Sequence, residues 1–143
     1  GYWPQHQRLA RARAEADELR RRLDEGRSVL AAAEAKARLG RLFGQYLALH
    51  DAVVAGNFGE AQSLSSPFFD AVRDEVSKGP DPTTRAALDE VLMRRDTLTA
   101  GIARGEGSVR EVLVPIERGL RRALGYPVLP LATAAAAPAE ARP

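Results

Sequence analysis

Residues 39–61, LGRLFGQYLALHDAVVAGNFGEA, join the widest apolar stripe of the chain to its clearest turn. From Leu39 to Val54 apolar residues recur every three or four positions, which predicts one face of an α-helix. Gly56 and Asn57 follow, and both residue types tolerate the positive φ that commonly ends a helix. Apolar positions then resume at helical spacing. The stretch therefore predicts two antiparallel helices joined by a tight turn, and it favours an all-α fold.

The turn has a distinctive pattern, GNFGEA, over residues 56–61. It is similar to the turn inside a tetratricopeptide hairpin. The resemblance implies that Gly56 lets the chain reverse, that Phe58 packs between the helices and that Ala61 permits close approach. The preceding helix lacks that family's Trp and Leu-Gly signals, and no repeat of about 34 residues is present. We therefore expect a generic helix hairpin with Phe58 in the core, and not a peptide-binding repeat array.

The chain downstream of the turn predicts three further helices, each with an apolar face at spacings of three and four. The first runs from Phe58 to Val76, and its continuous stripe favours a kink at Pro67 over a new start. The second is bounded by Asp81, which caps its start, and by Gly105, which ends it. The third begins at a capping box formed by Ser108 and Glu111, ends at Gly125 and contains Pro115.

Upstream of the stripe, residues 9–40 follow a heptad pattern. Six of the ten residues in its apolar seam are Ala or Gly, so the seam is thin. The a positions are Leu9, Ala16, Leu23, Leu30 and Ala37, and the d positions are Ala12, Leu19, Gly26, Ala33 and Gly40. A helix from Pro4 to about Ala55 would be roughly 75 Å long, too long for a compact domain of this size. We expect its first half to project as a coiled-coil-like stalk.

The charges beside the seam leave two interpretations of the stalk open. In a parallel homodimer, one pair of flanking residues would attract and three would repel: Glu15–Arg20 attracts, whereas Arg8–Arg13, Arg22–Arg27 and Lys36–Arg41 repel. Many of the same charges form favourable pairs within one helix at a spacing of four residues. The stalk is therefore either a solvated helix that packs weakly or antiparallel, or a homodimer through residues 9–40.

These patterns predict an all-α fold, an antiparallel helical bundle with a long N-terminal helix that projects as a coiled-coil-like stalk. The expected divisions are a charged stalk over residues 1–38, a bundle over 39–125 and a Pro/Ala-rich disordered tail over 126–143. The tail carries too little apolar bulk to offset the entropy of ordering it.

The composition excludes several classes of function. The 143 residues carry a net charge of +2, and their arginines mostly alternate with acids, so no basic face for nucleic acid is expected. The absence of Cys excludes disulfides and thiolate chemistry. No run of about 18 apolar residues and no signal peptide is visible.

His50 with Asp51 could be imagined as a metal or acid–base site. The second histidine, His6, lies far away on the stalk, and no His-x-x-x-His or Glu-x-x-His spacing exists. His50 falls on the apolar stripe, so we expect a histidine at the edge of the core. The serines at 63, 65 and 66 lack a nucleophile motif and a partner base.

The acidic group Asp70, Asp74 and Glu75 is expected to form a solvated outer face, balanced by Arg73 and Lys78. Paired carboxylates can perform acid–base chemistry where their environments differ, but nothing in the sequence marks a pocket there. We therefore predict no enzymatic activity, no catalytic residue, no cofactor and no metal site.

Three residues are candidates for interaction: Tyr2, Trp3 and Phe69. Trp and Tyr concentrate at membrane–water interfaces, which predicts that Gly1–Trp3 lie at a membrane surface beyond a preceding transmembrane helix. Phe68 and Phe69 point about 100° apart on a helix, so one is core and the other is a second core contact or an exposed anchor for a partner.

The expected function follows from these features. Arginine outnumbers lysine 19 to 2, which suggests a GC-rich genome. We expect the extracytoplasmic part of a membrane-tethered bacterial protein, at the cell membrane on the periplasmic side, that acts in protein–protein interaction or sensing. The alternative is a soluble cytoplasmic coiled-coil adaptor or assembly factor, in which Trp3 docks into a partner protein or a second chain.

Overall fold

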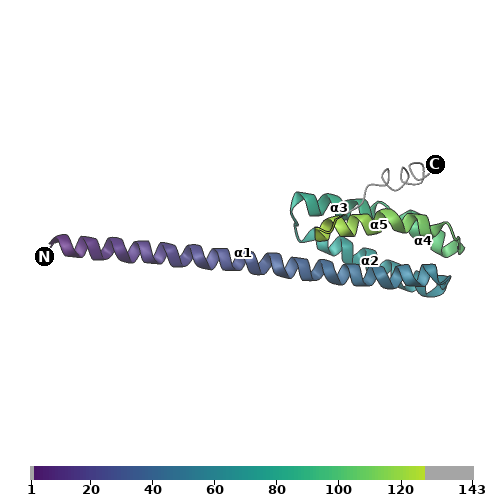
Figure 1. Ribbon diagram of the computed structural model, residues 1–143, viewed down its shortest axis with the longest axis horizontal. Coiled ribbons are helices and arrows are strands. Elements are labelled where there is room, and N and C mark those ends of the chain that lie inside the picture. Colours follow the sequence, from purple (N-terminus) through teal and green to yellow (C-terminus); the bar gives the residue numbers. More distant parts are fainter. Residues whose placement is uncertain (1, 128–143) are drawn as a thin grey trace, which may run out of the picture. The chain divides into compact units, whose positions relative to one another are not determined.

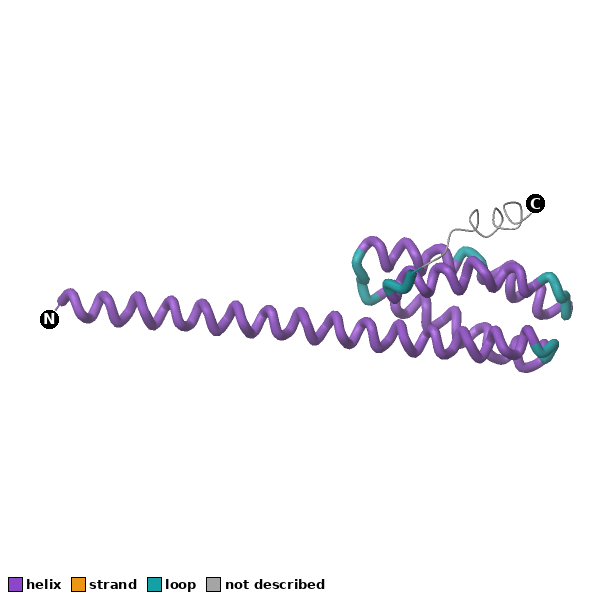
Figure 2. The backbone as a smooth tube through the Cα atoms, viewed as in Figure 1, coloured by secondary structure: helices purple, strands orange, loops and turns teal. Residues whose placement is uncertain are grey.

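The computed structural model describes residues 2–127, with the side chain of Tyr2 left out. Within this range the chain forms five α-helices and no strand (Figures 1 and 2). The helices are α1 (Tyr2–Val54), α2 (Phe58–Ser77), α3 (Pro82–Leu92), α4 (Arg95–Arg104) and α5 (Val109–Leu124). The predicted all-α fold with a long N-terminal helix is confirmed. Most of the expected tail, from residue 128 onward, lies outside the described residues.

The chain divides into two units, residues 1–37 and 38–143. The boundary expected from the sequence, after residue 38, lies one residue later. We call residues 2–37 the N-terminal segment and residues 38–127 the bundle unit. The two units share the helix α1, which is continuous through the boundary.

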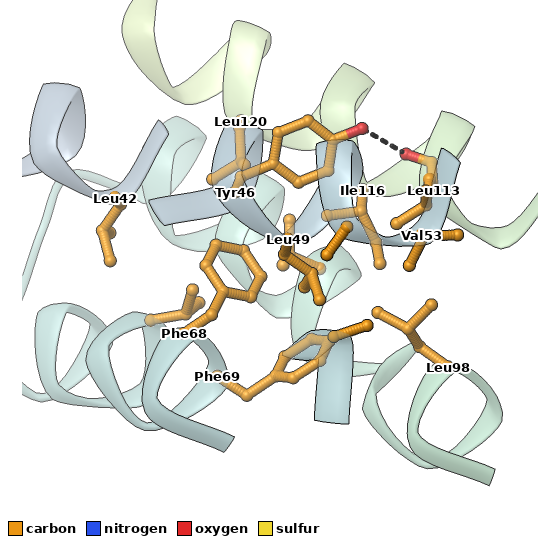
Figure 3. Packing of buried hydrophobic residues seen from close by; sticks show 14 of the residues in the cluster. Leu42, Tyr46, Leu49, Val53, Phe68, Phe69, Leu98, Leu113, Ile116 and Leu120 are labelled. Carbon is orange, nitrogen blue, oxygen red and sulfur yellow. Dashed lines mark hydrogen bonds between the residues drawn. The ribbon is translucent and has the colours of Figure 1, made fainter. Parts of the chain in front are cut away.

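The hydrophobic core belongs to the bundle unit and draws on all five helices. Its largest fully buried side chains include Tyr46 and Leu49 from α1 and Phe68 and Phe69 from α2, and α3, α4 and α5 contribute aliphatic residues (Figure 3). Phe68 lies with its ring centroid 6.2 Å from that of Tyr46. Most of the apolar stripe after residue 38 therefore faces the core, as its spacing predicts, but Leu47 and Val54 are 41% and 43% exposed.

Helices α3 and α5 approach each other closely because α5 has a glycine at the contact. A Cβ added at Gly119 of α5 would lie 2.8 Å from Val91 Cγ2 and 3.1 Å from the Ala87 carbonyl oxygen of α3. These distances leave no room for a side chain, so α5 and α3 pack nearly backbone to backbone here. The α1 helix instead reaches its neighbours through long side chains such as Tyr46.

The turn between α1 and α2 confirms the hairpin and revises its details. Gly56 has a φ of 74°. No non-glycine residue among those described has a positive φ, so Asn57 does not share this role. Asn57 caps α2 instead: its Oδ1 accepts from the Glu60 N–H at 3.3 Å, and its Nδ2 donates to Glu60 Oε2 at 2.9 Å. Phe58 is only partly buried against the core, so its expected full burial is wrong.

The single helix predicted between Asp81 and Gly105 is wrong, because the chain breaks into α3 and α4 at Met93 and Arg94. Both residues keep right-handed helical dihedral angles, and the Arg94 N–H bonds to the Val91 carbonyl three residues back. The helix therefore tightens by a local turn without a Gly or Pro. With the break, α3 packs against α2 and α5, and α4 also contacts both.

The capping box predicted at Ser108 and Glu111 is also wrong. Ser108 has helical dihedral angles and its side chain makes no capping hydrogen bond. The first N–H groups of α5 bond instead to backbone carbonyls three residues earlier, from Val109 to Glu106 and from Arg110 to Gly107. The predicted cap at Asp81 is confirmed, since its carboxylate accepts from the Thr84 N–H and hydroxyl. Helices α2 and α5 remain continuous through Pro67 and Pro115.

Candidate functional site

The N-terminal segment carries a row of uncovered apolar side chains. Its helix has no proline beyond the first turn and is rich in Ala, Arg, Leu and Glu, which favour helix. Leu9, Leu19, Leu23 and Leu30 occupy a and d positions of the heptad pattern and are 52%, 64%, 52% and 58% exposed. We call the a and d residues of this segment the apolar seam: Leu9, Ala12, Ala16, Leu19, Leu23, Gly26, Leu30, Ala33 and Ala37.

The opposite side of the segment consists of the b, c and f positions of the heptad, and we call it the outer face. Ion pairs link its Glu18 to the next turn of the helix. Glu18 is paired with Arg21 and, at 3.2 Å, with Arg22 Nε. Exposed pairs of this kind contribute about 0.2–0.5 kcal/mol each to a helix. They support the helix locally and leave the apolar seam uncovered.

Trp3 is 72% exposed, so the structure leaves this candidate residue available for contact. The side chain of Tyr2 and the whole of Gly1 lie outside the described residues.

Phe69, the third candidate, is fully buried, so the exposed-anchor alternative is wrong. Its ring centroid lies 5.0 Å from that of Phe68 (Figure 3). Arg95 of α4 lies over the ring, 5.6 Å from its centroid. Adjacent residues on a helix point about 100° apart. Both aromatic rings are covered because α2 packs against α1 on the side of Phe68 and against α4 on the side of Phe69.

The acidic group on α2 divides into two environments. Asp70 accepts from Arg73 and Arg95, each at 3.0 Å, and Asp74 lies 3.3 Å from Lys78. These exposed carboxylates confirm the solvated face predicted for this part of α2. Glu75 was predicted to lie on the same solvated face, and that prediction is wrong.

Glu75 is buried, with 5% of its surface exposed. Its carboxylate accepts from Arg38 Nε at 2.9 and 3.1 Å, and Lys78 Nζ lies 3.8 Å away. A buried carboxylate requires such a partner, because an unpaired charge is costly in the interior. The sequence held no local signal of this ion pair, since Arg38 lies 37 residues earlier.

A shallow groove of about 220 Å³ adjoins this ion pair. Its lining includes Arg41, Gln45 and Asp74 in addition to Arg38 and Glu75. Pockets for small molecules are commonly about 300–1,000 Å³ and mostly apolar. The groove is smaller and ionic, and Glu75 and Asp74 already have cationic partners. The arrangement is that of a structural ion pair between α1 and α2.

The residues around His50 form part of the core edge. The ring of His50 lies 5.9 Å from that of Tyr46, and its Nδ1 lies 3.4 Å from Asp51 Oδ1. This half-buried position agrees with the predicted core-edge histidine. Over residues 2–127, no three His, Cys, Asp or Glu side chains are grouped as metal ligands would be.

The Tyr46 hydroxyl is buried and donates to the Leu113 carbonyl at 3.3 Å, as Figure 3 shows. Burial raises the pKa of Tyr46, the nearby Glu117 carboxylate raises it further, and Arg121 acts in the opposite direction. This tyrosine therefore stays protonated and serves the packing of α1 against α5.

Within the described part of the chain, no helix has the length and apolar character needed to cross a bilayer. No family model, no curated protein and no solved structure matches the chain.

Proposed function

We propose that this chain is a non-enzymatic protein-interaction module whose binding surface is the apolar seam of the N-terminal segment. One observation carries the proposal: four leucines, at Leu9, Leu19, Leu23 and Leu30, are each more than half exposed along a single helix. A heptad seam is the surface that helices bury against one another. Covering these leucines would remove apolar area from water, which is the main driving force for association.

The bundle unit is a folded domain that offers no substrate site, and this supports the proposal. Its core is filled by large side chains, and the groove beside Glu75 is small and ion-paired. No described residue of the bundle combines an unpaired titratable group with a pocket of substrate size. These features favour binding over catalysis, and the residues offer no constellation to which a reaction could be assigned.

A crosslinking experiment tests the proposed surface. A photo-reactive amino acid is placed in the source cells at Leu19, on the apolar seam, and separately at Ser28, on the outer face. We expect covalent protein adducts from position 19 and at least fivefold fewer from position 28, because only the seam faces a bound partner. Equal yields at the two positions, or no adduct at position 19, would refute the proposal.

The proposal extends to location: the segment acts at a membrane surface, on the periplasmic side in a bacterium. The support is the 72% exposure of Trp3, since Trp is enriched where apolar and aqueous phases meet. The alternative is a cytoplasmic adaptor in which Trp3 docks into a protein.

Trp3 is the single tryptophan, so its emission reports on this site alone. With vesicles of phosphatidylethanolamine and phosphatidylglycerol we expect a blue shift and quenching by brominated acyl chains. An unchanged emission spectrum would favour the cytoplasmic alternative.

A further inference from the structure

The flanks of the apolar seam carry mostly positive charge. Over residues 8–37 the e and g positions of the heptad, which border a seam, hold six basic residues, two acids and Val29: Arg8, Arg13, Arg20, Arg22, Arg27 and Lys36 against Glu15 and Glu34. The outer face carries mostly negative charge. It holds four acids, Asp17, Glu18, Asp24 and Glu25, and two arginines, Arg11 and Arg21. The segment is thus polarised, with its positive side around the uncovered leucines.

The flanking charge is not neutralised within the chain at three central positions. Among residues 2–127 no ion pair or hydrogen bond involves Arg13, Arg20 or Arg27. Arg22, on the other flank, shares Glu18 with Arg21. A partner that covers the seam would come to lie beside these arginines, in the e and g positions that set partner choice in paired helices.

From this polarity we infer that the seam binds an amphipathic helix of another protein whose own seam is flanked by Glu or Asp. The inference rests on the proposed function and names the partner's chemistry. Opposite charges along both flanks would attract in either orientation of the two helices, and a basic partner would be rejected by repulsion.

A second copy of this chain fits the surface poorly. In a parallel pair three of the flanking contacts repel, among them Arg8–Arg13 and Arg22–Arg27. In an antiparallel pair each e flank faces another e flank, so a register centred on Arg20 sets Arg13 against Arg27 and Arg20 against itself. Like charges at these positions disfavour self-association.

A lipid surface also fits poorly. Helices that lie on membranes bury a broad apolar face, whereas a strict a/d seam is the narrower surface of paired helices. Here the seam combines four Leu with four Ala and one Gly, which leaves little apolar bulk for acyl chains but lets a second helix approach closely.

Two designed peptides of about four heptads test the inference on the intact chain. Both carry Leu at a and d; one has Glu at every e and g position, and the other has Lys. At about 50 mM salt we expect the Glu peptide to bind at least tenfold more tightly than the Lys peptide. The preference should shrink at about 0.5 M salt, where screening acts over only a few ångströms.

Matched variants assign the preference to the flanks. Arg20→Glu with Arg27→Glu leaves four basic and four acidic residues on the flanks, so it should abolish the preference. Arg11→Glu with Arg21→Glu, the same charge change on the outer face, should preserve it. Circular dichroism checks that each variant keeps its helix. Leu19→Ser with Leu23→Ser should weaken binding of both peptides.

Several results would overturn the inference. Equal binding of the two peptides, binding of neither, or the same shift in both double-arginine variants would remove the charge basis. Self-association at micromolar concentration in sedimentation experiments would assign the seam to a second copy. Leu19-dependent binding to anionic vesicles would assign it to lipid. If position 19 crosslinks to protein in cells while both peptides bind equally, the proposed function stands and only this inference fails.

Discussion

The buried hydroxyl of Tyr46 makes the stability of the bundle unit depend on pH in the alkaline range. Its pKa is raised, chiefly by burial, whereas a tyrosine in the unfolded chain titrates near pH 10. The unfolded state therefore releases this proton at a lower pH than the folded state does. The stability that the neutral hydroxyl contributes is complete below about pH 10 and is lost as the pH rises above it.

We predict that Tyr46→Phe will reduce this loss of stability at alkaline pH. Between about pH 9.5 and 11.5 the unfolding free energy of the variant should fall less than that of the wild type, although at pH 7 the variant should be less stable by about 0.5–1.5 kcal/mol for the lost hydrogen bond. Urea titrations at each pH give both values. Parallel pH profiles for the two proteins would show that Tyr46 is not the group responsible.

Ser65 is a polar residue placed in the core without a partner. It is 2% exposed, and its hydroxyl makes no hydrogen bond. A buried hydroxyl left in this state costs about 1–3 kcal/mol. Ser65→Ala should therefore raise the unfolding free energy by about 1 kcal/mol more than Ser66→Ala, an exposed control on the same helix that includes the same change in helix propensity. Equal effects in denaturant titrations would indicate that the Ser65 hydroxyl is satisfied in solution.

At the scale of the elements, the contact between α3 and α5 depends on Gly119. Gly119→Ala places a methyl group 2.8 Å from Val91 Cγ2 and 3.1 Å from a backbone oxygen, so the helices must separate. We expect a loss of about 1–3 kcal/mol. Gly44→Ala in α1 is the matched control, because nothing lies within 4 Å of its added Cβ, and should gain about 0.5–1 kcal/mol. Thermal unfolding should move in opposite directions for the two variants.

The elements also show where sequence patterns suffice and where they do not. Local signals predicted α1, α2 and the cap at Asp81, because periodicity and capping chemistry lie within a few residues of each other. The break at Met93 has no Gly or Pro to announce it, and it depends on contacts with other helices. The burial of Glu75 depends on Arg38, which is distant in sequence. The seam of the candidate surface was readable from the heptads, whereas the burial of both Phe68 and Phe69 required knowledge of two neighbouring helices.

At the scale of the whole molecule, the hydrophobic core and the proposed binding surface lie in different units. Every residue of the hydrophobic core lies at or after Leu39. Deletion of residues 1–30 leaves two helical turns before the core, so we expect the midpoint of thermal unfolding to change by no more than a few degrees while the helical signal in circular dichroism falls. A deleted chain that fails to unfold cooperatively would show that the N-terminal segment helps to hold the bundle.

The flanking arginines have a further consequence for the lifetime of the protein. A single helix without tertiary contacts opens locally at low free-energy cost, and an opened backbone is a protease substrate. Arg13, Arg20 and Arg27 are exposed cleavage sites for trypsin-like enzymes while the seam is empty. A helix bound along the seam would cover these sites and suppress the opening. Free chains would then be degraded faster than bound ones, and the cellular amount of this protein would follow the amount of its partner.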